Sequence, residues 1–523
     1  MNHPERADLI LRSSSIFTAA GAAPMSGYVA VRGERILSAG AAGEAALLGP
    51  GTRILELGSR TVCPGFTDAH CFFAGHAMGL VGIDLAGVDR AEGVLELAGA
   101  AAGELAEGKP LLGRGLRPGL VEGRPGAELE AAFPSRPLVL FAAGGESCWM
   151  NRAAREAYGF SPESCYPEAY WRLLRAVLAD RDFTLPAFKA YMRMLNARGV
   201  TAVKEMGFDD YYGFAGLLDE LRLAGELSLH VAFMSQPVGA GMDLGHGRAM
   251  RRRFGDPRAD LLFSGYNRMT DGSIGQLCGD LKEPYACAPG IRCRAAIDYA
   301  GIEAEVLKAD AEGFRFSLHA QGDAAIAKAV DILGKCRRDA GGRLLNRHAM
   351  TDLEFSDPAD LERMGKLGII AEIYPQIMSL ASRAEKKAMI EEKIGAERGK
   401  RYWNRRKLLD SGVLVSCGTD LPLLVPDIPE SIYHACGALF PEGGEPFNAE
   451  NAMTLPELLT AWTRNGAYNL GQEAERGSLE PGKLADIAVF DRDLFSLPLA
   501  EMRRARIHST YWRGRVVYAS TGI

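Results

Sequence analysis

Three segments of the chain place a histidine or an aspartate directly after a short apolar run. His70 closes the segment Cys-Pro-Gly-Phe-Thr-Asp-Ala-His, His319 follows Phe-Ser-Leu, and Asp420 follows Leu-Val-Ser-Cys-Gly-Thr. Imidazole and carboxylate groups ligate divalent metals and transfer protons near neutral pH. Because the catalytic groups of a parallel barrel lie where strands end and loops begin, this shared placement predicts that the three side chains gather in one site.

The segments around these residues alternate between strand and helix patterns. Apolar runs at 138–141, 201–203, 316–318 and 414–416 precede amphipathic stretches, of which 324–335 is the clearest. Repeated strand-then-helix patterns predict a parallel sheet. The chain of 523 residues is longer than the ~250 residues that one barrel needs. We therefore expect an α/β fold, a (β/α)8 TIM barrel with additional material.

Both ends of the chain carry short β-type runs separated by glycine-containing turns. Two β-rich ends that flank a long alternating middle predict one small β-sandwich domain, built from residues 1–60 and 475–523. Residues 61–474 would form the barrel. An inserted segment rich in Ala, Gly and Leu lies near 85–135.

Composition excludes several classes of protein. The chain is 47% apolar and 24% charged with a net charge of -6, and it has no basic block, so nucleic acid is not an expected partner. No apolar run reaches the ~20 residues that span a bilayer, and charged residues interrupt the N-terminal segment, so we expect no membrane association and a cytoplasmic location. The ten cysteines form no Cys-x-x-Cys pair. A homodimer is the expected assembly if the chain oligomerises.

A series of motifs in a fixed order runs along almost the whole chain. They lie at residues 63–70, 113–115, 133–137, 199–201, 271–275, 319–323, 418–422 and 477–486. By these motifs the chain resembles the amidohydrolase superfamily, in its YtcJ-like branch. The resemblance implies a TIM barrel whose active site hydrolyses a non-peptide C–N bond, in an amide, formamide or cyclic amide of small size.

The resemblance also implies a metal site. The superfamily's usual site holds a His-x-His pair, a central ligand that is often a carboxylated lysine, two later histidines and a final aspartate. His70, His319 and Asp420 match the first histidine, one later histidine and the aspartate. These three would hold one divalent metal, zinc first, with iron or manganese as alternatives, and Asp420 would take a proton from the attacking water.

Four positions depart from the superfamily's pattern. Phe72, Asn267 and Phe355 stand where the second histidine of the pair, the lysine and the other later histidine are expected. Glu146 replaces the histidine of a Gly-His-x-x-Trp motif. A binuclear centre is therefore not expected, and a site without any metal stays open.

Three functions stay open at this point. The first is the hydrolase with at most one metal. The second is a metal-independent isomerase or lyase in which Asp420 or Glu146 acts as base and His70 or His319 as acid, because neighbouring groups with separated pKa values suit proton transfer. The third is a non-catalytic binding protein.

Further side chains near strand ends or motif positions are expected to shape the pocket for the small-molecule substrate. Lys204 and Glu205 also follow an apolar run, and an ion pair is their expected role. The pocket residues are Phe72, Arg114, Trp149, Asn267, Phe355, Tyr374 and Gln376.

Overall fold

The computed structural model describes residues 6–106, 108–142, 147–162, 165–207, 212–236 and 241–520. The chain divides into two compact units. The first consists of Met1–Cys71, Met192–Gly207 and Arg222–Ile523, and the second of Phe72–Tyr191 and Phe208–Leu221. The segment near 85–135 lies in the second unit, which begins before it and ends after it.

The first unit contains a parallel barrel, as the sequence predicts. In the described residues its eight strands pair in the order β17-β16-β15-β14-β13-β12-β11-β6. A parallel bridge between Cys71 and Leu421 joins the two edges of this sheet and closes the barrel. The strands are β6 (Phe66–Cys71), β11 (Val200–Glu205), β12 (His230–Ser235), β13 (Leu261–Met269), β14 (Phe316–Ala320), β15 (Ala349–Asp352), β16 (Ile370–Ile373) and β17 (Leu414–Cys417).

Helices follow the barrel strands. Each amphipathic helix buries its apolar face by packing against the rest of the unit. In α10 (Asp323–Leu333), Ile326, Ala329 and Val330 are fully buried, as the helical spacing predicts. No helix in the described part of the chain has the length and apolar character needed to cross a membrane. The other helices of this unit include α8 (Leu244–Phe254), α9 (Tyr299–Ala311), α11 (Pro358–Leu367), η4 (Ile377–Leu380), α12 (Arg383–Lys393), α13 (Ala396–Gly399), α14 (Arg405–Asp410), α15 (Ile428–Gly437), α16 (Leu455–Trp462), α17 (Arg464–Leu470) and α18 (Leu499–Met502).

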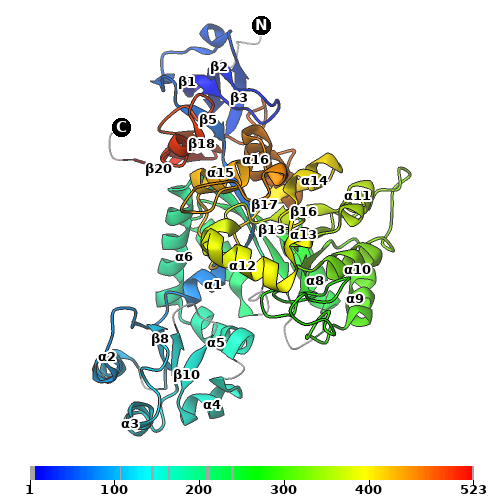
Figure 1. Cartoon of the computed structure of the whole chain (residues 1–523). Helices are drawn as coiled ribbons and strands as arrows, with labels where there is room; N and C mark the ends of the chain where they lie inside the picture. Colours follow the sequence, from blue (N-terminus) through cyan, green and yellow to red (C-terminus); the bar gives the residue numbers. More distant parts are fainter. Residues whose placement is uncertain are drawn as a thin grey trace. The chain divides into compact units, whose positions relative to one another are not determined.

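The two ends of the chain form one hydrogen-bonded sheet, in which the blue N-terminal and red C-terminal strands lie side by side (Figure 1). Antiparallel pairing of β5 with β18 joins them, with Val62 opposite Val489. Both side chains are buried in one apolar cluster. The strands are β1 (Leu9–Ile16), β2 (Met25–Arg32), β3 (Arg35–Gly40), β4 (Arg53–Glu56), β5 (Thr61–Pro64), β18 (Ile487–Phe490), β19 (Ile507–Trp512) and β20 (Arg515–Ala519).

The second unit has a sheet of its own, in the order β10-β9-β8-β7. The apolar run at 138–141 is a strand, as its composition predicts, but it belongs to this sheet and not to the barrel. The strands are β7 (Ile83–Asp84), β8 (Leu111–Leu116), β9 (Leu138–Ala142) and β10 (Cys148–Met150). The helices are α1 (Phe73–Met78), α2 (Ala91–Glu104), α3 (Arg124–Ala132), α4 (Arg152–Tyr158) and α5 (Cys165–Ala179), while α6 (Arg181–Asn196) and α7 (Phe214–Leu223) belong partly to each unit.

Candidate active site

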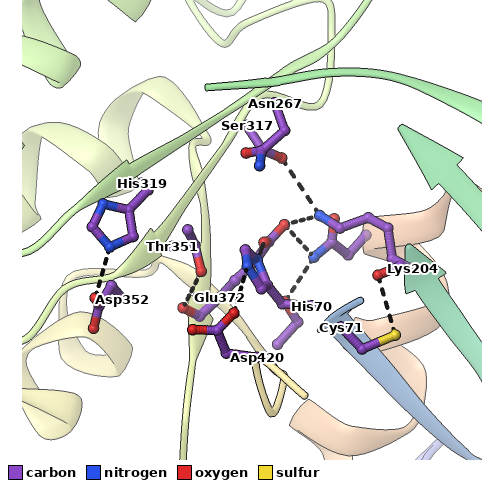
Figure 2. A network of polar contacts seen from close by, with 12 residues as sticks. His70, Cys71, Lys204, Asn267, Ser317, His319, Thr351, Asp352, Glu372 and Asp420 are labelled. Carbon is purple, nitrogen blue, oxygen red and sulfur yellow. Dashed lines mark hydrogen bonds and ion pairs between the residues drawn. The ribbon is translucent and has the colours of Figure 1, made fainter. Parts of the chain in front are cut away.

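A buried ion pair crosses the interior of the barrel beside His70 (Figure 2). Glu372 on β16 and Lys204 on β11 are both fully buried, and the Lys204 ammonium donates to one carboxylate oxygen of Glu372. The other oxygen, Oε2, lies 3.1 Å from Nδ1 of His70 on β6. An ionised carboxylate only accepts hydrogen bonds, so Nδ1 of His70 carries a proton. The ion pair expected of Lys204 is thus present, with Glu372 as its partner.

Hydrogen-bond donors and positive groups surround the Glu372 carboxylate. Asn469 donates to it at 3.0 Å, and the Arg315 guanidinium lies 3.8 Å away. Burial raises the pKa of Glu372, but Lys204, His70 and Arg315 outweigh burial and hold that pKa below its usual range. Burial lowers the pKa of Lys204 to about 8, against the opposing effect of Glu372. Glu372 is therefore an ionised group that orients His70.

Asp420 lies on the other side of His70. Its Oδ1 is 3.7 Å from Nε2 of His70, and its backbone N–H donates to the His70 carbonyl at 2.8 Å. Asp420 adopts a left-handed backbone with φ 53°. Close approach of the strands requires Gly418, because a Cβ there would lie 2.6 Å from Cβ of His70. Burial, with a contribution from Asp352, raises the pKa of Asp420 to about 6.

His319 on β14 has a carboxylate partner of its own. Its Nε2 lies 2.9 Å from Oδ2 of Asp352, and Nδ1 lies 3.9 Å from Oδ1 of Asp271. Among the described residues, the buried Nδ1 has no hydrogen-bond partner. Burial lowers the pKa of His319, but Asp352, Asp271 and Asp420 outweigh burial and raise it to about 9. At neutral pH His319 is an imidazolium whose Nδ1 can donate to a bound group.

The three residues expected to bind metal do not converge fully. Within the described ranges, one set of three His, Cys, Asp or Glu side chains has all its donor atoms within 4.8 Å of one another, and it is Asp310, Cys336 and His348. Figure 2 shows His319 turned toward Asp352, apart from the group around His70. His70 and Asp420 form one pair, and His319 stands beside it.

A model of the amidohydrolase family matches residues 53–518. The chain belongs to this family.

Relatives of this amidohydrolase match it over nearly its whole length. N-substituted formamide deformylase of Arthrobacter pascens is 23% identical over 561 residues, covering 98% of this chain and 99% of the relative. A Bacillus subtilis protein named as amidohydrolase YtcJ is 23% identical over 494 residues, covering 90% of this chain and 91% of the relative. A solved structure of an uncharacterized metal-dependent hydrolase from Pyrococcus horikoshii has a TM-score of 0.74 at 20% identity, covering 94% of this chain and 99% of that chain. The resemblance and the barrel fold are confirmed.

In this amidohydrolase, His70 and Asp420 offer two donor atoms to one divalent metal ion, and the positions expected for a second ion offer none. Metal-ligating histidines usually donate their second ring N–H to a carboxylate, as His70 does to Glu372. With that proton on Nδ1, Nε2 of His70 faces the Asp420 carboxylate, an arrangement that a metal ion or a second proton between them would stabilise. Phe72 and Phe355 offer no ligand atom for a second ion, and Asn267 cannot form a carbamate.

The Asp310 cluster lies at the other end of the barrel, because His348 precedes the first residue of β15. Nδ1 of His348 accepts the Phe316 backbone N–H at 3.0 Å, and Nε2 donates to Asp310 at 3.0 Å. Both ring nitrogens are thus engaged within the protein. We assign this cluster a structural role at the start of β15.

Of the expected pocket residues in the first unit, Tyr374 lies against His70. The Tyr374 ring lies 5.5 Å from the His70 ring, and its hydroxyl hydrogen-bonds Thr351 at 3.1 Å. The Asn267 amide donates to Gln236. Gln376 anchors the segment after Asp420 through Val425 and Asp427.

Phe355 packs elsewhere. It is fully buried in an aromatic cluster with Tyr402 and Trp403, and its ring centroid lies 6.2 Å from that of Tyr402. An imidazole would not fill the same apolar space, which explains physically why phenylalanine suits the position.

Three expected pocket residues lie in the second unit. The Arg114 guanidinium donates to the carbonyls of Leu80 and Gly82 and pairs with Asp84 at 3.1 Å, so it ties β7 to β8. Trp149 packs against the apolar cluster of this unit. Phe72 is the residue before α1. Glu146 lies outside the described residues.

Sequence reasoning missed the two carboxylates that hold the histidines. Glu372 interrupts the apolar run Ile-Ile-Ala-Glu-Ile, and Asp352 ends the run Ala-Met-Thr. A charged side chain inside a buried strand needs a partner. That rule singles out Glu372, and the position at a strand end singles out Asp352.

Proposed function

We propose that this amidohydrolase hydrolyses a non-peptide C–N bond of a small molecule, in an amide, formamide or cyclic amide. The observation that carries the proposal is the placement of Asp420, whose Oδ1 lies 3.7 Å from Nε2 of His70 in a buried setting that raises the pKa of its carboxyl to about 6. A second histidine, His319, lies near it and contacts the carboxylate of Asp352 through Nε2. Its relative named N-substituted formamide deformylase supports this class of bond.

Asp420 acts as the general base. Its carboxylate accepts the proton of the attacking water and passes that proton to the leaving nitrogen. The His319 imidazolium donates through Nδ1 to the carbonyl oxygen, where negative charge develops. His70, fixed by Glu372, lies beside Asp420, whose backbone N–H donates to the His70 carbonyl at 2.8 Å and holds the two residues together.

One divalent metal ion, zinc, iron or manganese, would be held by His70 and Asp420, with Nδ1 of a neutral His319 as the third donor, so that binding would displace a proton from His319. When bound, such an ion polarises the carbonyl and lowers the pKa of a coordinated water. The roles of Glu372 and Asp352 are the same with or without it, because each fixes the orientation of a histidine.

A second candidate is a metal-independent isomerase or lyase. The separation of the two pKa values favours it, since Asp420 at about 6 and His319 at about 9 form a base and an acid near neutral pH. Such a pair can move a proton between two carbon atoms, or remove one during elimination, without an attacking water.

Metal content and activity together test these proposals. We would measure bound metal by elemental analysis in wild type, His70→Ala and the control His508→Gln, whose histidine lies on β19. Formamides, amides and cyclic amides are then assayed with and without a chelator. Stoichiometric metal that is lost in His70→Ala, with chelator-sensitive hydrolysis, supports the metal-dependent hydrolase. Chelator-resistant proton exchange or elimination without hydrolysis would overturn it in favour of the second candidate.

A further inference from the structure

A pocket adjoins the active site along the ends of β15 and β16. Asp352, which holds His319, and Tyr374, which packs against His70, belong to both the active site and this pocket. The remaining wall comes from η4 and from the segment that begins α14. The lining includes Asp352, Tyr374, Ile377, Trp403, Arg405 and Leu408.

Arg405 is a buried cation without a counter-ion. Its residue is 5% exposed, and among the described residues no carboxylate acts on its guanidinium. Nη2 is buried and, among the described residues, has no hydrogen-bond partner. The ionisable groups that act on it are the thiols of Cys417 and Cys436, whose pKa values burial raises, so both are neutral. An unpaired buried charge is strongly unfavourable, so its presence points to a partner from outside the chain.

Trp403 adds a second unpartnered donor to the same wall. Its indole Nε1 is buried with no hydrogen-bond partner in the described part of the chain, and its ring centroid lies 5.9 Å from the Arg405 guanidinium carbon. The Trp403 backbone N–H donates to the Glu354 carbonyl at 2.7 Å, which fixes this segment against the end of β15.

The backbone of this wall is strained. Asp352, Leu353 and Trp403 all adopt left-handed conformations, with φ of 78°, 57° and 51°. Side chains other than glycine rarely adopt such angles, and they persist mainly at ligand sites, where the surrounding structure enforces them. Three such residues in one pocket indicate that the chain is shaped there for a ligand.

We propose that this pocket binds a carboxylate on the substrate, with the Arg405 guanidinium and the Trp403 indole N–H as donors. The planar guanidinium fork matches a carboxylate, and Ile377 and Leu408 line the same pocket with apolar surface. The inference rests on the proposed function for the reacting end and assigns the substrate class, an N-formyl or N-acyl amino acid.

Binding by calorimetry tests the pocket independently of turnover. The probes are N-formyl ω-amino acids of increasing chain length, each compared with its neutral carboxamide, on wild type and on Arg405→Gln. For the best chain length we expect wild type to bind the carboxylate about 10-fold or more tightly than the carboxamide, as for a buried charged hydrogen bond. Arg405→Gln should lose this preference while its affinity for the carboxamide stays within about 3-fold.

Trp403→Phe provides a second variant if Arg405→Gln does not fold, and thermal melting identifies folded protein. It keeps an aromatic ring and removes one donor, so we expect it to reduce the preference for the carboxylate. No binding of any carboxylate probe to wild type, equal binding of each pair, or an unchanged preference in Arg405→Gln would overturn the pocket assignment. Carboxylate-selective binding without cleavage would leave the assignment standing and count against the proposed hydrolysis alone.

Discussion

Oε2 of Glu372 lies 3.1 Å from Nδ1 of His70, while the opposite oxygen of the same carboxylate receives the Lys204 ammonium. Barrel interiors are usually filled by apolar side chains. Here a row of polar and charged side chains runs through the interior, from Lys204 through Glu372 and His70 to Asp420. The arrangement holds one histidine in one tautomer, and it makes the stability of the barrel depend on a buried ion pair.

Removing one partner of that ion pair should destabilise the protein strongly. Lys204→Met leaves Glu372 ionised and buried with fewer positive neighbours, so we expect a loss of about 3–5 kcal/mol in the free energy of unfolding. Urea denaturation measures it. The double variant Lys204→Met/Glu372→Gln removes both charges and should lose less than the sum of the two single changes. Additive losses would show that the two side chains do not stabilise each other.

The Asp352–His319 pair should make stability depend on pH in protein treated with a chelator. Because the pKa of His319 is about 9 in the folded protein and ~6.5 in an unfolded chain, its contribution is complete below pH ~6.5 and lost as pH rises through about 9. Asp352→Asn removes the main cause of the raised pKa. We expect the advantage of wild type over Asp352→Asn, roughly 2–3 kcal/mol at pH 6, to shrink toward pH 9.

Denaturation of both proteins at several pH values checks this expectation. Asp410→Asn, a change at an exposed aspartate paired with Arg406, serves as the control. A constant difference between wild type and Asp352→Asn from pH 6 to pH 9 would contradict the assignment of a charged His319.

Asp420→Asn should abolish catalysis while leaving the fold intact. The amide keeps the size of the side chain but cannot accept a proton, so we expect kcat to fall by ~10²–10⁴-fold. In wild type, kcat/KM should rise with pH through about 6 as the Asp420 carboxyl ionises. Steady-state kinetics on a cleaved substrate measures both. Near-wild-type activity in Asp420→Asn would exclude Asp420 as the base.

Strand ends made part of the site predictable. His70, His319 and Asp420 each follow an apolar run, and the barrel brings His70 to within 3.7 Å of Asp420. The pairing of Lys204 with Glu372 joins strands far apart in sequence, and no local pattern specifies such a register. The sequence predicts that Lys204 needs a partner and leaves open which one.

The second unit shows a different limit of sequence reasoning. The apolar run at 138–141 has the composition of a barrel strand, yet it pairs with β8 and β10. Arg114 follows a similar run and was expected at the substrate pocket, but its guanidinium is engaged with Leu80, Gly82 and Asp84. Strand composition reports burial, and it does not report which sheet a strand joins.

His230 links the start of the barrel to the terminal sheet, and replacing it should weaken the protein at neutral pH. Nδ1 lies 3.0 Å from Asp260 before β13, and Nε2 lies 2.9 Å from Asp486 before β18. Each ring nitrogen of His230 therefore contacts a carboxylate. His230→Gln would disrupt these contacts at two largely buried carboxylates, so we expect a loss of about 3 kcal/mol in urea denaturation.

Lowering the pH should remove the stability that the contacts of His230 with Asp260 and Asp486 contribute. Burial raises the pKa values of Asp260 and Asp486, but His230 and neighbouring arginines outweigh burial and lower both. Carboxylates with lowered pKa values stabilise the fold above their unfolded pKa of ~3.9, and this stability is lost as pH falls below it. The difference between wild type and His230→Gln should therefore be constant near pH 6 and narrow below pH ~4. His508→Gln, a change at a partly exposed histidine of the terminal sheet, should show neither the loss nor the narrowing. A difference that widens in acid would show that His230 is not held by these two carboxylates.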